Sequence, residues 1–380
     1  MRPPGTDAGR NGPTDAAKRP IRLATTFDLS TLELPIVQAP MAGGPSTPQL
    51  AIAVCDAGAL GFLAAGYKRA DAVRDEIHAV RAATAAPFGV NLFVPAEEPA
   101  DREGVRRYLE RLKPEAERQG AALGEPSFDD DDWHAKLEVL YEKRPAVASF
   151  TFGCPDESVI NHLHGVAVAV WVTVTNVPEA LAAREAGADG LVVQGTEAGG
   201  HRGGFVDDGS GEGGIGLLAL LRTIAGATSL PMVATGGIAD GAALAAVLCA
   251  GASAGQVGTA LMLAPEAGTP DAQRKALAER RPTRVTRAFT GRAARGIVNR
   301  FMTEHHDAAP VAYPEIHHVT SPLRAAARRR GDADAFNLWA GQAHELAQAR
   351  PAGKIVRAMA DEARAVLDQV SAGLSPSRYQ

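Results

Sequence analysis

Short apolar runs alternate with alanine-rich segments of helical length through most of the chain. Runs of β-branched and other apolar residues are typical of buried strands. Their alternation with helical segments is typical of a parallel sheet in which a helix follows each strand. The pattern predicts eight strands, near residues 35–38, 61–63, 88–93, 146–150, 166–174, 190–193, 232–234 and 255–257.

Three of the predicted strands are introduced by nearly the same sequence. Residues 57–66 read AGALGFLAAG, residues 186–195 read AGADGLVVQG, and residues 250–259 read AGASAGQVGT. In each, we expect a helix to end at a glycine in the left-handed conformation, followed by a turn and a strand. Eight such units over about 220 residues match a (β/α)₈ barrel, which takes about 250 residues. The predicted fold class is therefore α/β, a (β/α)₈ TIM barrel, with a doubly wound sheet as the alternative because strand periodicity does not show closure.

Three segments lie outside the repeating unit. Residues 1–20 are expected to form a disordered N-terminal arm, residues 96–144 a helical insertion, and residues 271–380 a C-terminal capping and substrate region. The barrel itself is expected to take residues 21–95 and 145–270. The acidic run Asp129–Asp132 of the insertion is interpreted as a solvated loop, since it has no paired ligand spacing for a metal. The insertion and the C-terminal region together predict a smaller, mainly helical cap over the barrel mouth.

Composition and charge exclude several classes of protein. The 380 residues are 46% apolar and 22% charged, which are ordinary globular values. The net charge of −5 and the lack of a basic stripe argue against nucleic-acid binding. Residues 241–265 carry no charge, but glycines and polar residues interrupt them, so we expect no membrane span. The three separated cysteines and the lack of an apolar signal-peptide core indicate a cytoplasmic protein, and a homo-oligomer is left open.

The loops that follow the predicted strands carry the candidate chemistry, because a barrel of this kind places its active site there. His201 is the one histidine in a glycine-bracketed loop at a strand end, GGHRG. An imidazole with a pKa near 6.5 suits proton abstraction or contact with an anionic substrate. The histidine pairs His162 with His164, His305-His306 and His317-His318 lack a carboxylate or cysteine at metal-ligand spacing, so no metal site is expected.

Two glycine loops follow the last two predicted strands. Gly236 and Gly237 follow the seventh, and Gly258 with Thr259 follows the eighth. Either loop alone is interpreted as a tight turn, but both at successive strand ends favour a phosphate site built from backbone N–H groups. The chain contains neither G-x-G-x-x-G at the start of a strand–helix unit nor G-x-x-x-x-G-K-[ST], which argues against a Rossmann dinucleotide site or a P-loop.

Other strand-end residues fit a flat heterocycle or an ordinary loop equally well. Gln194 and Asn91 can hydrogen-bond a ring or cap their own loops. Met41 and Trp339 can pack on a ring or fill the core.

In this order, the segments QAPMAG (38–43), FGVNL (88–92), QGTEAGGH (194–201), ATGGI (234–238) and QVGT (256–259) closely resemble the nitronate monooxygenases, formerly called 2-nitropropane dioxygenases. The resemblance runs from about residue 35 to residue 300, with LWAGQ (338–342) as a weaker echo. It implies non-covalent FMN and an active-site histidine at His201. The positions that match the cofactor-binding residues of the family are Met41, Ala42, Gly43, Asn91, Gln194, Gly199, Gly237, Gln256, Val257, Gly258 and Thr259, with Gly236 close by.

The activity implied by this resemblance is oxidation of alkyl nitronates, or of nitroalkanes, by O₂ to a carbonyl compound and nitrite. Many relatives carry a histidine in the Ser-Phe-x-Phe-Gly segment where this chain has Thr151. The substrate preference is therefore open, and we expect Thr151 and Trp339 to contact the substrate. The alternatives are an NAD(P)H-dependent flavin reductase on the same fold, of the quinone or enoyl-acyl-carrier type, and a flavin-binding protein without turnover.

Overall fold

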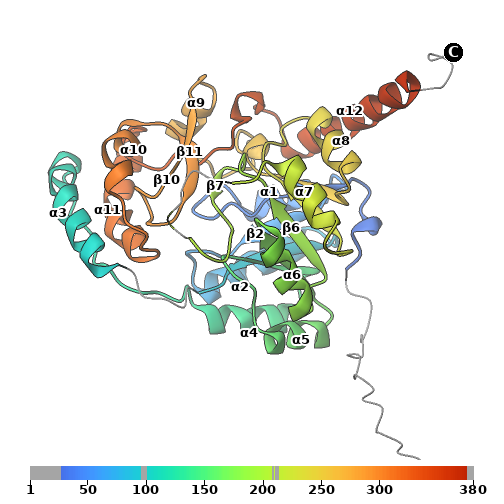
Figure 1. The fold of residues 1–380 in the computed structure, drawn as a ribbon, viewed down its shortest axis with the longest axis horizontal. Coiled ribbons are helices and arrows are strands. Elements are labelled where there is room, and N and C mark those ends of the chain that lie inside the picture. The colour runs from blue at the N-terminus through green and yellow to red at the C-terminus, as the bar shows by residue number, and fades with distance from the viewer. Residues whose placement is uncertain (1–26, 96–100, 208, 210–213, 375–380) are drawn as a thin grey trace, which may run out of the picture.

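The computed structural model describes residues 27–95, 101–207, 209 and 214–374, so the expected arm over residues 1–20 lies outside the described residues. Eight parallel strands form its central sheet (Figure 1). The strands are β1 (Ile36–Gln38), β2 (Gly61–Ala64), β3 (Phe88–Phe93), β4 (Val147–Thr151), β5 (Ala169–Val174), β6 (Gly190–Gln194), β8 (Met232–Thr235) and β9 (Ala254–Val257). All eight predicted strands are present, although β5 begins three residues later than expected, because residues 166–168 form the turn that leads into it.

The sheet closes on itself. Its strand order is β1-β9-β8-β6-β5-β4-β3-β2, and every neighbouring pair is parallel. Val37 of β1 forms a parallel bridge with Leu60, just before β2, and this bridge joins the two ends of the order. The predicted (β/α)₈ TIM barrel is therefore confirmed, and the doubly wound alternative is wrong.

Apolar side chains fill the barrel at two levels. Phe62, Trp171 and Val233 belong to the cluster inside the ring, and Phe27 and Leu29 pack against this cluster. A larger cluster lies between the sheet and the surrounding helices and includes Ile36, Val172 and Leu191. Because strand residues alternate between these two layers, a single-residue change of register would exchange the two sets of side chains.

One helix accompanies each barrel strand. These helices are α1 (Pro48–Cys55), α2 (Ala70–Ala83), α4 (Trp133–Lys143), α5 (Glu157–Gly165), α6 (Val177–Ala186), α7 (Leu217–Ala225), α8 (Gly241–Cys249) and α12 (Ala352–Gly373). The three repeated sequences behave as expected, since Gly58, Gly187 and Gly251 take φ of 89°, 100° and 105°. Only glycine adopts this left-handed conformation without steric cost, and each of the three lies in the turn one to three residues beyond the end of its helix.

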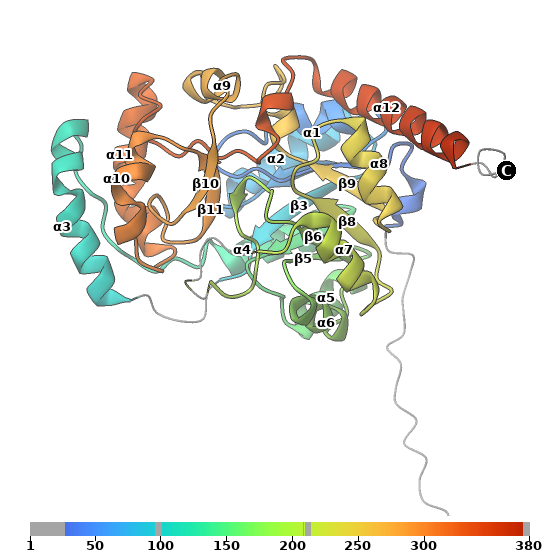
Figure 2. The same ribbon diagram turned by 45° about the horizontal axis from the view of Figure 1, so that its top comes forward.

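Two of these helices come from segments expected to lie outside the barrel. Helix α4, from the 96–144 insertion, packs against α2, α5 and β3 in the outer helical ring. Helix α12, near the end of the 271–380 region, lies along α8 and α1 (Figure 2). The insertion thus divides into a cap helix and a barrel helix, and the C-terminal region returns from the cap to complete the ring.

A smaller unit, called the cap here, covers one side of the barrel mouth (Figure 2). It consists of α3 (Arg102–Gln119), α9 (Asp271–Leu277), α10 (Arg300–His305), α11 (Glu315–Arg330) and an antiparallel sheet in the order β10 (Thr283–Thr286), β11 (Ala294–Ile297), β7 (Gly200–His201). Short 3₁₀ helices are η1 (Leu29–Thr31), η2 (Thr259–Leu261), η3 (His306–Ala308) and η4 (His344–Leu346). The cap has its own core around Tyr108, Phe289 and Phe301. None of the helices within the described residues is long and apolar enough to cross a bilayer.

Candidate active site

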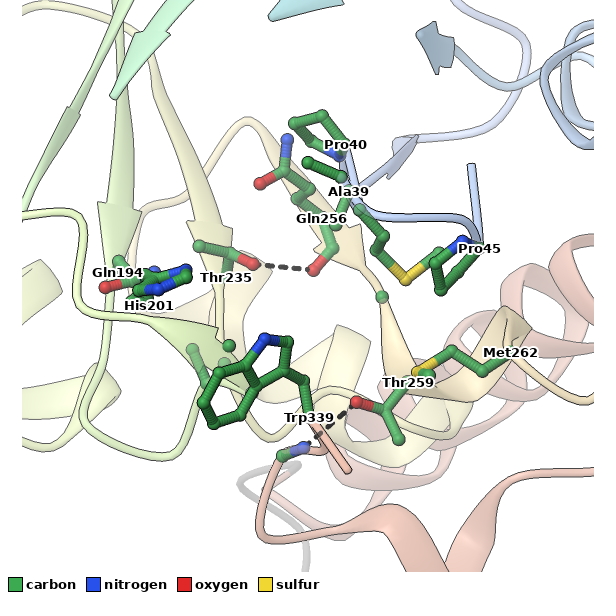
Figure 3. Close-up of a pocket in the computed structure, with 18 of the residues that line it drawn as sticks. Ala39, Pro40, Pro45, Gln194, His201, Thr235, Gln256, Thr259, Met262 and Trp339 are labelled. Atoms are coloured by element: carbon green, nitrogen blue, oxygen red, sulfur yellow. Dashed lines mark hydrogen bonds between the residues drawn. The ribbon is translucent and has the colours of Figure 1, made fainter. Parts of the chain in front are cut away.

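A large cavity lies at the carboxyl ends of the barrel strands, between the barrel mouth and the cap. Including the open space at its mouth, it encloses about 1370 Å³. Figure 3 shows His201, Gln194, Gln256 and Trp339 around this space. The expected site residues that line it are Met41, Ala42, Gly43, Asn91, Thr151, Gln194, Gly199, His201, Gly236, Gly237, Gln256, Gly258, Thr259 and Trp339.

Val257 is the expected cofactor-binding residue that the structure does not bring to the cavity. Its side chain is fully buried in the layer between sheet and helices. Its carbonyl oxygen accepts a hydrogen bond of 2.8 Å from the N–H of Ala39. The physical reason is the two-residue alternation of a strand, because Gln256 faces the cavity and its neighbour must then face outward.

His201 belongs to β7, which pairs with β11 of the cap. Its Nε2 lies 2.9 Å from the hydroxyl of Thr290. Its ring meets the ring of Trp339 at 5.5 Å and that of Phe152 at 5.7 Å, both edge-to-face. The imidazole is therefore held by one hydrogen bond and by aromatic contacts from both barrel and cap.

The surroundings of His201 keep its ring neutral. Burial lowers the pKa of His201 to about 3, and the positive charges of Arg292 and Arg324 act in the same direction. The hydroxyl of Thr290 also donates to the carbonyl oxygen of Arg292, at 3.3 Å. Because a hydroxyl has one hydrogen to donate, Thr290 accepts from the Nε2–H of His201. This assigns the free lone pair of the imidazole to Nδ1.

Gln194 fixes the loop that carries His201. Its Nε2 donates to the carbonyl oxygen of His201 at 3.0 Å, and its Oε1 accepts from the N–H of Gly203 at 2.8 Å. Both ends of the amide therefore hold the backbone of β7 and of the residues just after it, while the side chain lines the cavity. Gln194 therefore does both things that were expected of it: it caps its own loop and it lines the cavity.

Asn91, Thr151 and Thr173 form a polar strip on three successive strands. The Nδ2 of Asn91 lies 3.0 Å from the hydroxyl of Thr151 and 2.9 Å from that of Ser149. The hydroxyl of Thr151 lies 3.2 Å from that of Thr173. Thr151 therefore offers the cavity a hydroxyl that is already part of a hydrogen-bonded chain.

The two glycine loops lie side by side, as the adjacency of β8 and β9 requires. The hydroxyl of Thr235 donates to the carbonyl oxygen of Gln256 at 3.1 Å, and that of Thr259 accepts from the N–H of Gly341 at 3.0 Å (Figure 3). Gly236 and Gly237 have φ of 119° and 71°, and a Cβ at Gly236 would lie 3.0 Å from the backbone nitrogen of Ala198. The loops thus bring bare backbone to the cavity wall, and this arrangement fits the terminal phosphate of a mononucleotide such as FMN.

Further residues that were not expected from the sequence complete the cavity. They include Gln273, Arg328 and Asn337, together with Tyr67, Phe93 and Phe152 on the barrel side. The motif Ser-Phe-x-Phe-Gly contains Phe152, so the sequence held a signal for that residue. No local pattern marked Arg328 or Asn337, because they reach the cavity only through the packing of the cap.

Three guanidinium groups make the cap side of the cavity positive: Arg328, which is half-buried and lines the cavity, and the buried Arg292 and Arg324. Arg292 stacks at 4.1 Å over the ring of Phe152, and Arg324 and Arg328 both donate to Oδ1 of Asn337, at 3.3 and 2.7 Å. Burial lowers the pKa of Arg324 to about 10, still well above neutrality. Among the residues that the structure describes, no carboxylate forms an ion pair with any of the three. Positive potential without a counter-ion favours an anionic ligand.

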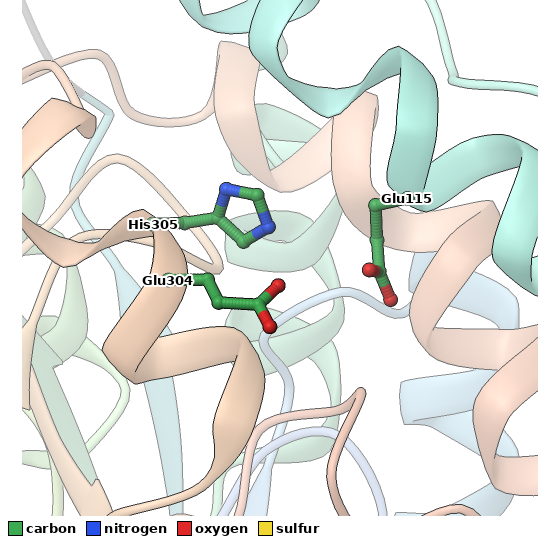
Figure 4. A group of neighbouring side chains, drawn as sticks. All are labelled: Glu115, Glu304 and His305. Atoms are coloured by element: carbon green, nitrogen blue, oxygen red, sulfur yellow. The ribbon is translucent and has the colours of Figure 1, made fainter.

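A second cluster of titratable groups lies in the cap, where Glu115 of α3 faces Glu304 and His305 at the end of α10 (Figure 4). Arg300 holds both carboxylates, at 2.8 Å from Glu115 and 2.8 Å from Glu304, and Arg118 also contacts both. Two guanidinium groups thus contact both oxygens of Glu115 and the Oε2 of Glu304. The cluster is better described as an ion-pair junction between two cap helices.

The histidines His162 and His164 have structural partners. His162 stacks on the ring of Tyr141 at 3.7 Å, and Nε2 of His164 lies 2.8 Å from the carboxylate of Asp189. These contacts account for both side chains without a metal.

Comparison with known proteins places this geometry in a family. The family model for nitronate monooxygenase matches residues 25–362. A nitronate monooxygenase from Pseudomonas aeruginosa is 42% identical, covering 88% of this chain and 97% of the relative, and one from Paraburkholderia phytofirmans is 39% identical, covering 89% and 94%. The solved structure of a nitroalkane oxidase from Streptomyces ansochromogenes superposes with a TM-score of 0.86 at 50% identity, covering 89% of this chain and 99% of that one. FabK from Thermotoga maritima, at 24% identity and a TM-score of 0.70, shares the fold. The chain belongs to the nitronate monooxygenase family and is an oxidoreductase.

Proposed function

We propose that this protein binds FMN and uses O₂ to convert alkyl nitronates to carbonyl compounds and nitrite. The observation that carries the proposal is the position of His201, which lies in one cavity with two paired glycine loops and a positive cap wall. Family membership supports nitronate oxidation. The cofactor, the oxidant and the products are our inference from the chemistry of the cavity and from the resemblance of its motifs.

The residues that would hold FMN divide by chemistry. The backbone of Gly236, Gly237 and Gly258, with the hydroxyl of Thr259, suits the phosphate. Met41, Asn91 and Gln194 offer an apolar surface and amide groups to the flat ring system. When bound, FMN supplies the redox chemistry, accepting electrons from the substrate and passing them to O₂.

His201 would handle the substrate as a neutral base. Its Nε2–H is held by Thr290, which leaves the Nδ1 lone pair free to accept a proton from a neutral nitroalkane. A nitronate has already lost that proton. With this substrate the imidazole therefore positions the anion and does not become protonated. The positive charges of Arg292, Arg324 and Arg328 then stabilise the nitronate.

Thr151 and Trp339 would shape the rest of the substrate site. Trp339 presents an indole to the cavity, edge-to-face with His201. The hydroxyl of Thr151 lies within the polar strip where many relatives carry an imidazole. We propose that this substitution leaves more room beside the substrate, because a threonine side chain is smaller than a histidine.

The test begins with the visible spectrum of the purified protein, which should show bound oxidised flavin. Mixing with ethyl nitronate without oxygen should bleach the flavin, and admitting O₂ should restore the colour with release of nitrite. A protein that binds flavin but is bleached rapidly by NADH or NADPH, and not by nitronate, would be a reductase and would overturn the proposal. A spectrum unchanged by either reagent would identify a flavin-binding protein without this turnover.

A further inference from the structure

The acidic run Asp129–Asp132 is only partly the solvated loop that its composition indicates, since Asp129 and Asp130 are exposed but Asp131 and Asp132 are half-buried. Oδ1 of Asp131 accepts a hydrogen bond of 2.8 Å from the backbone N–H of Tyr67, in the loop between β2 and α2. Oδ2 of Asp132 accepts one of 2.9 Å from the N–H of Ala70, the first residue of α2. The run therefore holds a loop at the rim of the cavity, about sixty residues earlier in the chain.

The run is itself rigidly held. The second carboxylate oxygen of Asp131 lies 2.8 Å from Nζ of Lys136, whose side chain is 1% exposed. The carboxylates of Asp129 and Asp130 accept from the N–H groups of Asp131 and Asp132, at 2.6 and 3.1 Å. A buried ion pair on one oxygen thus orients the other oxygen toward Tyr67.

Tyr67 needs this support because its backbone conformation is unfavourable. Its φ is 65°, in the left-handed region that a non-glycine residue rarely adopts. A strained residue persists only when its surroundings fix it in place, and such residues concentrate at ligand sites. Here the hydrogen bond from the N–H of Tyr67 to Asp131 supplies that constraint.

In this conformation the ring of Tyr67 joins the barrel to the cap along the cavity wall. It lines the cavity and stacks on His317 of α11, with ring centres 4.1 Å apart and planes at 8°. It meets the ring of Phe93 edge-on at 5.4 Å, and its hydroxyl accepts from the hydroxyl of Tyr313 at 3.2 Å. Any movement of the Tyr67 backbone would therefore change the shape of this wall.

We propose that Tyr67 is a specificity-determining residue that limits the alkyl chain of the substrate, and that Asp131 is its positioning residue. This inference rests on the proposed function for the identity of the substrate. An aromatic wall fixed in one position accepts short alkyl groups and excludes longer ones. Releasing Tyr67 from its strained conformation would open the wall and relax the selection.

The test uses two double variants of the full-length holoenzyme. Asp131→Asn with Lys136→Met keeps an oxygen acceptor for Tyr67 and removes both charges of the buried pair. Asp131→Ala with Lys136→Met removes the acceptor as well. Both variants lack an unpaired buried charge, so they differ in the hydrogen bond to Tyr67 and not in the ion pair.

The first readout is selectivity, the ratio of kcat/KM for ethyl nitronate to that for hexyl nitronate. We expect the Asn variant to keep the wild-type ratio, and the Ala variant to shift it toward the longer chain by about fivefold, mainly through KM. Tyr67→Ala should shift it the same way, and Asp71→Asn, an exposed carboxylate on α2, should leave it unchanged. Equal ratios in the Asn and Ala variants would overturn the role of Asp131, and an unchanged ratio in Tyr67→Ala would overturn that of Tyr67.

Two further measurements need no turnover. Amide hydrogen exchange should be faster at Tyr67 in the Ala variant than in the Asn variant. Titration of the flavin spectrum with nitroethane and 1-nitrohexane should show the same change of preference in dissociation constants. If the proposed function fails, the wild-type protein would show no turnover, while the two double variants would still differ in amide hydrogen exchange and in nitroalkane binding. If the positioning inference fails, the enzyme would be active, but the two double variants would show the same amide hydrogen exchange at Tyr67 and the same dissociation constants for the two nitroalkanes.

Discussion

Nε2 of His201 lies 2.9 Å from Oγ1 of Thr290, and this hydrogen bond joins strand β7 to the connection between β10 and β11. The same hydroxyl reaches the carbonyl oxygen of Arg292 at 3.3 Å. Thr290 is 1% exposed, so water does not compete for the contact. One buried hydroxyl therefore sets both the orientation and the tautomer of the imidazole.

Replacing Thr290 by valine should remove that control at nearly constant volume. We expect kcat/KM for a nitronate to fall about fivefold, the effect of losing one hydrogen bond worth about 1 kcal/mol. The assay is oxygen consumption with flavin content measured in parallel. Thr290→Ser keeps the hydroxyl and should retain most of the activity; equal losses in the two variants would contradict the assignment.

Buried neutral histidines should make the fold sensitive to acid. Burial, with the charge of Arg324 nearby, lowers the pKa of His317 to about 2. Since the unfolded chain binds this proton near pH 6.5 and the folded chain does not, the stabilising effect is present above pH 6.5 and is lost as the pH falls toward 2. The urea midpoint should therefore fall between pH 7 and pH 5, and less steeply in His317→Gln. His78→Gln, at an exposed position on α2, should keep the wild-type slope.

The positive cap wall should matter for charged substrates. Arg328 lines the cavity, and its guanidinium donates to Asn337 at 2.7 Å. Arg328→Met should raise the KM for a nitronate about fivefold and change that for the neutral nitroalkane much less, because only the anion loses an electrostatic attraction. Arg329→Met, at the exposed neighbouring position, serves as the matched control. An equal rise for both substrates would show that Arg328 acts by shape alone.

Gly199 should be essential for flavin affinity. A Cβ at this position would lie 2.5 Å from the carbonyl carbon of Ala340 and the nitrogen of Gly341. Gly199→Ala must therefore push apart the β6–β7 loop and the segment that hydrogen-bonds Thr259. We expect the dissociation constant of FMN to rise about tenfold, the loss that a displaced site produces. Gly165→Ala, which meets no atom within 4 Å at the end of α5, should bind FMN normally.

The ion-pair junction of the cap should be a point of stability. Glu115 is 2% exposed and depends on Arg300 for two contacts, at 2.8 and 2.9 Å. Arg300→Met should lower the free energy of unfolding by about 2 kcal/mol, because a buried carboxylate loses a partner while Arg118 remains. Denaturant titration measures this. Arg106→Met, which breaks an exposed pair with Glu103, should have no measurable effect.

The barrel was predictable because each of its units carries a local signal. The repeated glycines predicted the left-handed turns at Gly58, Gly187 and Gly251. Because the strands of the barrel are parallel, their carboxyl ends all lie at the same end of the barrel. The glycine loops and His201 could therefore be assigned to one cavity before their distances were known. The side chain of Val257, a residue expected to bind the cofactor, lies in the layer between sheet and helices, as the alternation of β9 after Gln256 requires.

The cap was less predictable because its contacts join distant segments. The hairpin of β10 and β11 was not expected, because the composition of this region predicts helices. The third strand of its sheet comes from residues 200–201, far away in the sequence. Arg328 reaches the cavity only after this assembly, whereas Tyr67 lies in the loop between β2 and α2 on the barrel side. Whether residues 96–144 belonged to cap or barrel was likewise decided by packing, since α3 contacts α11 while α4 contacts α2.

Helix α12 has a consequence for how the protein is made. It packs on α8 through Ile355, Met359 and their neighbours, and Glu362 accepts a hydrogen bond of 2.9 Å from the N–H of Gly241. The last helix of the barrel therefore follows all the cap segments in the sequence. During translation, the apolar face of α8 stays uncovered until about a hundred further residues have been synthesised. Synthesis that stops before residue 352 would release a barrel with one open side.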